Sequence, residues 1–215
     1  VKGRLQPATL AQIPFLPLSR RDCSFRIYAI LVDYVNHAVS KDALLLLTPE
    51  ERLRFLSYSN NKSALNFLLG RLLIRWAISS IKSVSPSAVR ISQDSANAKP
   101  YSAFASFNIS HAEGLVVGVF GDGLEFGIDV EHTQRTCDLD HIVDICFPEC
   151  LRKSYYERSP DQRVPLFFEL WTYLEAMGKL TGDGLFALPR PNPRDVHYRL
   201  CFDTLPYVGH LVVRD

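Results

Sequence analysis

Apolar residues recur at helical spacing in two long stretches of the chain. In residues 62–81 they return every three or four positions, which predicts a helix with one apolar face. Residues 163–180 predict a second long helix, which Gly182 ends. Before it, residues 139–156 predict a helical region that breaks near Pro148.

A shorter helix is predicted by its start signals. Thr48 suits the N-cap, Pro49 suits the first helical position, and Glu51 completes a capping box. Runs of β-forming residues predict strands, and the GDG segment at 121–123 predicts a hairpin turn between two of them. The predicted strands are residues 24–33, 88–92, 105–110, 115–120, 124–131, 196–202 and 207–213.

The order of these elements suggests two similar halves. Each half offers a strand, a short helix, a long helix and further strands, and LTPEERLRFLSY before the first long helix is echoed by FPECLRKSYYE before the second. We predict an N-terminal subdomain of residues 1–103, including an extended lead-in at 1–23, and a C-terminal subdomain of residues 104–215. The fold class is α+β.

Composition and charge exclude several classes of protein. Of 215 residues, 47% are apolar and 22% charged, which is typical of a folded domain. The net charge of +1 gives no bulk electrostatic case for nucleic-acid binding. The longest apolar run, at 43–47, is too short to cross a membrane, and residues 1–23 lack the continuous apolar core of a signal peptide. Five cysteines without a C-x-x-C pair favour reduced thiols in a cytoplasmic protein.

Two carboxylates in the sequence GIDVE are the first candidate for chemistry. On a strand, Asp129 and Glu131 project from the same face because side chains alternate. Such a pair repels itself, and oxygen ligands at this spacing suit Mg²⁺, which completes its shell with water and phosphate oxygens. The alternative is a solvated strand end that carries two charges.

A stripe on the second long helix is the next candidate. Trp171, Glu175 and Lys179 are spaced four apart and so share one face. The functional interpretation is a base beside an ammonium group that binds phosphate. The alternative is an ordinary exposed pair of opposite charges.

Two short segments complete the candidates. Ser110 and His111 follow a strand and could hold a phosphate, although a strand-end turn explains them equally well. Lys99 beside Pro100 offers a cation on a stiffened loop, or simply a surface lysine. The chain has neither a G-x-x-x-x-G-K-[ST] loop nor a G-x-G-x-x-G turn that opens a helix, so those modes of nucleotide binding are disfavoured.

Taken in order, these segments resemble the Sfp-type 4′-phosphopantetheinyl transferases. The matching segments are KP (99–100), FNISH (107–111), GIDVE (127–131) and W-T-x-x-E-A-x-x-K (171–179) followed by G-x-G-L (182–185). LTPEERLRF and LNFLLGRLLIR look like the family's N-terminal helices, so the resemblance covers roughly residues 24–213. It implies a pseudo-twofold fold of two similar subdomains, each with a small antiparallel sheet and a long helix, and an active site at the interface of the halves.

The resemblance also implies an activity. The family transfers the phosphopantetheine arm of coenzyme A to a serine of an apo carrier protein of fatty-acid, polyketide or peptide synthesis, and releases adenosine 3′,5′-bisphosphate. By position, Asp129 and Glu131 would bind Mg²⁺, Glu175 would be the general base, and Lys179 would bind the diphosphate. The residues that would hold coenzyme A are Arg54, Lys99, Pro100, Ser110, His111 and Lys179. We expect a holo-acyl-carrier-protein synthase type of enzyme that is cytoplasmic and monomeric.

The chain departs from the family pattern at two places. Leu174 stands where the family often has a lysine before the helix glutamate, and Glu149 is the nearest match to a third carboxylate near the metal. Because carrier proteins are generally acidic, the resemblance also suggests that residues 133–148, with Arg135 at the rim, face the carrier. Two alternatives remain: a non-catalytic binder of coenzyme A or carrier protein, and a Mg²⁺-dependent phosphodiesterase or nuclease, which the near-neutral charge disfavours.

Overall fold

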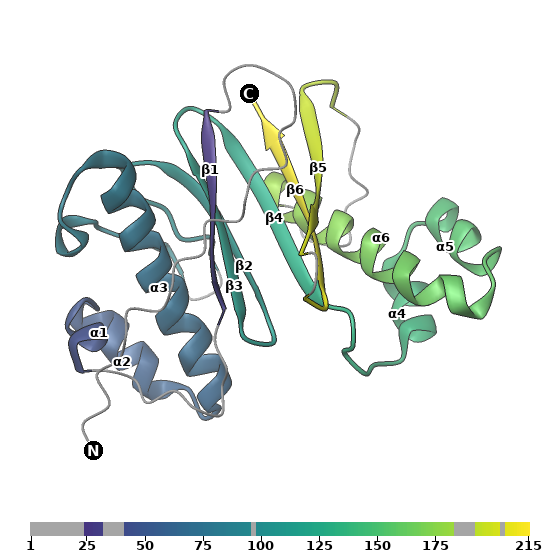
Figure 1. Ribbon diagram of the computed structural model, residues 1–215, viewed down its shortest axis with the longest axis horizontal. Helices are drawn as coiled ribbons and strands as arrows, with labels where there is room; N and C mark the ends of the chain where they lie inside the picture. The colour runs from purple at the N-terminus through teal and green to yellow at the C-terminus, as the bar shows by residue number, and fades with distance from the viewer. Residues whose placement is uncertain (1–23, 32–40, 96–97, 183–191, 203–204) are drawn as a thin grey trace. The chain divides into compact units, whose positions relative to one another are not determined.

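The chain folds into two compact units, Val1–Gly123 and Leu124–Asp215. The computed structural model describes residues 24–31, 41–95, 98–182, 192–202 and 205–215, and the statements below refer to these residues. Each unit holds a three-stranded antiparallel sheet and a helix of 22 residues (Figure 1). The predicted α+β class, with a small sheet and a long helix in each half, is confirmed.

The first unit builds its sheet from strands that are far apart in sequence. The sheet order is β1-β3-β2, so the last strand of the unit lies in the middle. Along the chain the elements are β1 (Phe25–Leu31), α1 (Lys41–Leu45), α2 (Pro49–Ser57), α3 (Asn61–Lys82), the 3₁₀ turn η1 (Pro86–Ala88), β2 (Ser106–Ala112) and β3 (Leu115–Gly121).

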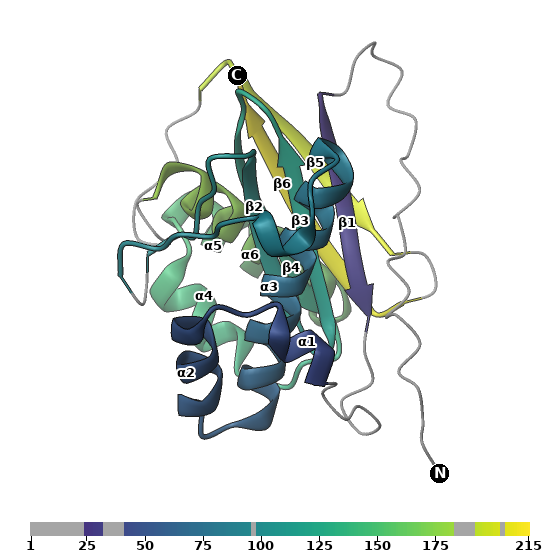
Figure 2. The ribbon, with the colours of Figure 1, turned by 90° about the vertical axis from the view of Figure 1, so that its left-hand side faces the viewer.

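Helix α3 covers one face of this sheet, as its apolar spacing predicts. Leu69 and Leu73 on the helix share a buried core with Ile30 of β1 and Phe120 of β3. Helix α2 lies beside the first turns of α3 (Figure 2). The predicted capping box of α2 is present, because Thr48 accepts a hydrogen bond from the Glu51 backbone and the Glu51 carboxylate accepts one from the Thr48 backbone.

The hairpin predicted at residues 121–123 is wrong. Strand β3 pairs with β1 and β2, whereas the next strand belongs to the other sheet, so the GDG segment joins the two units instead of closing a hairpin. The tight hairpin turn lies one strand earlier, at Glu113 and Gly114. Both have positive φ, 36° and 95°, as a two-residue hairpin loop of the I′ type requires.

The strand predicted at residues 88–92 is also wrong. The segment starts with the 3₁₀ turn η1 and continues as irregular chain, and only an isolated bridge joins Ser92 to Tyr101. The segment therefore forms a loop that folds back on itself.

The second unit repeats the topology of the first. Its sheet order is β4-β6-β5, again with the last strand in the middle. The helical region divides at Pro148, and α6 ends at Gly182 with φ 79°, both as predicted. The elements are β4 (Glu125–His132), α4 (Leu139–Cys146), α5 (Glu149–Tyr156), α6 (Pro160–Thr181), β5 (Asp195–Cys201) and β6 (Tyr207–Arg214).

The internal repeat is thus a strand, two short helices, a 22-residue helix and a hairpin, present once in each unit. The echo between LTPEERLRFLSY and FPECLRKSYYE falls on α2 and α5, which each precede the long helix. The predicted boundary after residue 103 differs from the division after Gly123, because β2 and β3 complete the sheet that β1 begins.

Helix α3 also meets the length and hydropathy criteria for a membrane span, with a mean hydropathy of 1.3 over its best window. Of that window, 61% is buried within the packed protein. A core helix of this length passes the same test, so the feature is weak evidence for a membrane. Among the described cysteines, Cys137, Cys146, Cys150 and Cys201 are all free thiols.

Candidate functional site

The candidate site of the second unit depends on an unusually close approach of strand β4 to helix α6. Gly127 lies directly against the helix backbone, and a Cβ atom added there would sit 1.9 Å from the carbonyl oxygen of Ala176. Only glycine fits at this distance. The contact brings Asp129 and Glu131, two and four residues further along β4, against the same helix.

Polar contacts between β4 and α6 follow the stripe that the sequence predicts. The Lys179 ammonium donates to Asp129 Oδ1 at 2.8 Å and to the Ile128 carbonyl at 3.1 Å. At the other end of the stripe, Trp171 Nε1 donates to Glu131 Oε1 at 3.1 Å. Asp129 is 5% exposed, so it is a buried carboxylate. These contacts form a network that joins helix to strand, so the alternative of an ordinary exposed pair of opposite charges does not describe Lys179.

Glu175 lies on the same stripe, between Trp171 and Lys179, and is half-buried. Burial raises the pKa of Glu175, the charge of Asp129 raises it further, Lys179 lowers it, and Glu131 raises it again. A carboxylate whose pKa is shifted towards neutrality is a better proton acceptor near pH 7 than an ordinary one.

Glu131 is subject to the same crowding of negative charge. Burial and the charge of Asp129 raise the pKa of Glu131, while Arg135 and the hydrogen bond from Trp171 lower it. Arg135 donates to Glu131 at 3.2 Å. Arg135 therefore supports the site itself, in addition to any contact with a carrier protein.

The carboxylates of Asp129 and Glu131 fit a magnesium ion that is only partly held by protein. Mg²⁺ usually takes one or two carboxylates and completes its shell with water and substrate phosphate. Among the described residues, no group of three or more Asp, Glu, His or Cys side chains is arranged to hold a metal. Glu149 is exposed at the start of α5 and belongs to no such group.

Leu174, which replaces the lysine common in the family, is 3% exposed and packs into the core with Val143, Phe168 and Val208. The Leu174 side chain is therefore part of the hydrophobic core of the second unit. Its position explains how the helix accommodates an apolar side chain next to Glu175.

The first unit contains its own cavity, of about 330 Å³. One side is a stripe of α3 with helical spacing, and the rest of the lining comes from the end of α2, from β2 and from the segment before β2. The lining residues are Arg54, Tyr58, Ser63, Asn66, Phe67, Gly70, Arg71, Gln93, Pro100, Ile109 and His111.

Two guanidinium groups meet in this cavity. Arg54 and Arg71 each donate to the same oxygen, Gln93 Oε1, at 2.7 Å. Both also lie over the ring of Phe67, with distances of 5.0 and 5.1 Å from guanidinium carbon to ring centroid. Positive charge concentrated in a partly buried cavity is suited to phosphate groups.

A buried carboxylate, that of Glu51, holds the guanidinium group of Arg71 in place. Glu51 lies 3.5 Å from Arg71 and 2.7 Å from Arg75, and all three side chains are below 10% exposed. Burial lowers the pKa of Arg71, Glu51 raises it, and Arg54 and Arg75 lower it further. The charges that act on Arg71 are thus one carboxylate and two further guanidinium groups, which leaves an excess of positive charge.

The structure brings together only some of the predicted coenzyme A residues. Arg54, Pro100 and His111 line the cavity. Ser110 does not, because it precedes His111 on β2 and points to the other face, where it is 5% exposed. Lys99 is exposed and lies beside the cavity-lining Pro100. Arg71 and Gln93 also line the cavity but were not among the predicted site residues.

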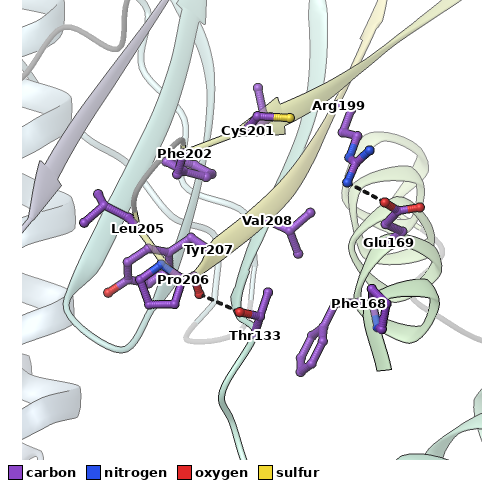
Figure 3. A pocket seen from close by; sticks show the side chains of 12 residues that line it. Thr133, Phe168, Glu169, Arg199, Cys201, Phe202, Leu205, Pro206, Tyr207 and Val208 are labelled. Atoms are coloured by element: carbon purple, nitrogen blue, oxygen red, sulfur yellow. Dashed lines mark hydrogen bonds and ion pairs between the residues drawn. The ribbon is translucent and has the colours of Figure 1, made fainter. Parts of the chain in front are cut away.

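A larger cavity of about 460 Å³ lies in the second unit, between α6 and the ends of β5 and β6 (Figure 3). Glu169 and Arg199 form an ion pair at its wall, and Thr133 donates to the carbonyl of Pro206. None of the predicted site residues lines this cavity, so it has no assigned role.

Each unit by itself presents charged groups of a kind suited to phosphate: the second unit has the contacts of Lys179 with buried Asp129, and the first has the guanidinium pair of Arg54 and Arg71. The comparisons with known proteins agree. Residues 37–120 match a family model described as "4'-phosphopantetheinyl transferase, N-terminal". The 4'-phosphopantetheinyl transferase HetI of a Nostoc species is 30% identical over 128 residues, covering 57% of this chain and 54% of the relative.

Two further relatives extend the match. The 4'-phosphopantetheinyl transferase gsp of Aneurinibacillus migulanus is 31% identical over 142 residues, covering 65% of this chain and 58% of the relative. The 4'-phosphopantetheinyl transferase Sfp of Bacillus subtilis is 28% identical over 167 residues, covering 76% of this chain and 73% of the relative. The chain spans just over half the length of the first two. The chain is thus related to the Sfp-type 4′-phosphopantetheinyl transferases.

Proposed function

We propose that the protein transfers the 4′-phosphopantetheine group of coenzyme A to a serine of an apo carrier protein, as a Mg²⁺-dependent enzyme of the holo-acyl-carrier-protein synthase type. The observation that carries this proposal is the network on β4 and α6, in which buried Asp129 accepts a hydrogen bond from Lys179 at 2.8 Å. Its residues stand at the positions that the resemblance assigns to metal binding and catalysis.

The second unit supplies the chemistry in this proposal. Glu175 accepts the proton of the carrier serine, directly or through a water molecule, so that the serine oxygen can attack the phosphorus. Lys179 donates hydrogen bonds to the diphosphate and favours departure of adenosine 3′,5′-bisphosphate. Phosphoryl transfer depends chiefly on positioning and charge neutralisation, which this network provides.

Asp129 and Glu131 are the residues that would hold Mg²⁺. The fit rests on their positions, because the two carboxylates are two residues apart on β4 and so share one of its faces, Asp129 is 5% exposed, and Glu131 is held by Trp171 and Arg135. The charge of Asp129 also raises the pKa of Glu131, and a divalent cation would relieve that repulsion. When bound, Mg²⁺ supplies positive charge to the diphosphate oxygens.

The first unit supplies recognition of coenzyme A. Arg54 and Arg71 offer the charge and the N–H donors that the 3′-phosphate requires, and His111 adds a further polar group to the cavity. Lys99 and Ser110, which do not line the cavity, remain proposals from the resemblance alone. Lys179 has a role in binding the diphosphate as well as in catalysis.

The partners follow from the reaction. They are coenzyme A and an apo carrier protein of fatty-acid, polyketide or peptide synthesis, with no role for nucleic acid or a membrane. We propose a cytoplasmic location, consistent with the four free thiols among the described residues. We also propose a monomer, because the two repeated units within one chain replace a dimer of single units.

A mass measurement on the carrier tests the function. The protein is incubated with coenzyme A, Mg²⁺ and an apo carrier protein, and both carrier and nucleotide products are weighed. A gain of one phosphopantetheine group with release of adenosine 3′,5′-bisphosphate is expected. Binding of coenzyme A without a gain would indicate a non-catalytic binder, and nucleotide fragments without a modified carrier would indicate a phosphodiesterase.

A further inference from the structure

Gln93 occupies a central position in the cavity of the first unit. Its Oε1 accepts hydrogen bonds from both Arg54 and Arg71, and its Nε2 donates to the Ala98 carbonyl at 2.6 Å. One amide group therefore joins α2, α3 and the segment that leads to Lys99 and Pro100. Because the two guanidinium nitrogens share one oxygen, they are held close together despite their like charges.

The group that joins Arg54 and Arg71 is a neutral amide and not a carboxylate. A carboxylate would hold two guanidinium groups more strongly, and the buried Glu51 does so for Arg71 and Arg75 nearby. A carboxylate at position 93 would also neutralise the cavity and repel an anion. An amide oxygen accepts the same hydrogen bonds without adding charge, so it positions the two guanidinium groups and leaves their positive charge for a ligand.

The neighbouring charges support this distinction. Arg71 interacts electrostatically with Glu51, Arg54, Arg75 and Tyr58, a set that contains only one carboxylate. That carboxylate contacts Arg71 and Arg75, and Arg54 and Arg71 share the neutral Gln93. One carboxylate among three guanidinium groups leaves this cluster with a net positive charge.

We infer that Gln93 is a positioning residue that holds Arg54 and Arg71 as a preformed pair for a phosphate dianion, and that it must be neutral to do so. The inference rests on the proposed function, in which this dianion is the 3′-phosphate of coenzyme A. Gln93 contributes to affinity for that phosphate and not to the transfer step.

The test compares two nucleotides that differ only in the 3′-phosphate. Binding of adenosine 3′,5′-bisphosphate and of adenosine 5′-monophosphate is measured by calorimetry for the wild type, Gln93→Met, Gln93→Glu and the matched control Gln162→Glu, which adds the same charge at an exposed position on α6. We expect Gln93→Met to weaken the bisphosphate about 10-fold and Gln93→Glu about 100-fold. Binding of the monophosphate should change less than about 3-fold, as should both ligands with the control.

The outcomes separate the two proposals. If the wild type does not prefer the bisphosphate, the proposed use of this cavity fails, and the inference fails with it. If the wild type prefers the bisphosphate and Gln93→Glu binds it as tightly as the wild type, or more tightly than Gln93→Met, Gln93 has only a structural role and the inference is overturned. The kcat at saturating coenzyme A supplies the second readout: it should stay within about 2-fold for both variants while KM rises, and an equal loss of kcat would contradict a positioning role.

Discussion

Replacing Gly127 with alanine tests whether the close contact between β4 and α6 maintains the proposed transfer site. The added Cβ would lie 1.9 Å from the Ala176 carbonyl oxygen and 2.7 Å from the Leu180 backbone nitrogen. Both are backbone atoms, so no side-chain rotation can relieve the overlap. The helix and the strand must separate.

The required displacement can be estimated from the contact distances. Ordinary van der Waals contact begins near 3.4 Å, so α6 would have to move about 1.5 Å away from β4. Such a shift would lengthen the 2.8 Å contact between Lys179 and Asp129 beyond hydrogen-bonding distance. We expect a loss of about 1–3 kcal/mol or more in the free energy of unfolding and a fall of about 100-fold in kcat.

Urea unfolding and the rate of carrier modification measure the two effects. Gly123→Ala is the control, because Gly123 has φ 69° and no atom within 4 Å of an added Cβ. The control should lose about 1–2 kcal/mol through backbone strain and keep its kcat. The reasoning is refuted if Gly127→Ala keeps kcat within about 3-fold of the wild type and loses less than about 0.5 kcal/mol.

Three further predictions concern single residues of the second unit. Asp129→Ala should lower the rate more than about 10-fold at low Mg²⁺, and a near-normal rate in a Mg²⁺ titration would remove Asp129 from the metal site. Ile145 is 57% exposed on α4, so Ile145→Asp should raise KM for the carrier and leave KM for coenzyme A unchanged; parallel changes would place the carrier elsewhere. Burial, with the charges of Arg199 and His197, lowers the pKa of His210 from 6.5 to about 4. The unfolded chain therefore binds this proton more readily, so the free energy of unfolding should be highest above pH 6.5 and fall by about 1–2 kcal/mol as the pH drops to about 4, after allowance for partial solvation. Urea unfolding across this range should lose that fall in His210→Asn, and an unchanged fall would assign it to another group.

Local signals in the sequence were enough to place the long helices and the start of α2, although they did not predict the short helix α1. The capping box of Thr48 and Glu51, the break at Pro148 and the stop at Gly182 each act within one helical turn, and all three are present. The stripe from Trp171 to Lys179 was predicted for the same reason, because helical spacing alone determines which side chains share a face.

Strand pairing could not be predicted in this way. The GDG segment at residues 121–123 has the composition of a hairpin turn, but β3 pairs with β1, whose residues lie about 90 positions earlier. A turn signal describes the backbone locally and does not say which sheet the next strand joins. The predicted boundary after residue 103 differs from the structure for the same reason. It separates β2 and β3 from β1, with which they form one sheet.

The site was predictable only where residues are close in sequence or carry charges that suggest chemistry. Asp129 and Glu131 are two residues apart on one strand, so alternation indicated a shared face. Gln93 is 39 residues from Arg54 and 22 from Arg71, and a lone glutamine carries no signal of its own. The close approach at Gly127 likewise depends on α6, which lies far along the chain.

The most direct test of the central claim, that the network on β4 and α6 performs the transfer, is the single-turnover rate of carrier modification by Glu175→Gln. The matched control is Glu169→Gln on the same helix. The Glu169 carboxylate pairs with Arg199 at the wall of the larger cavity of the second unit, which no predicted site residue lines. We predict that Glu175→Gln lowers the rate about 100-fold or more with little change in affinity for coenzyme A, whereas Glu169→Gln stays near the wild-type rate. A wild-type rate in Glu175→Gln would contradict the claim.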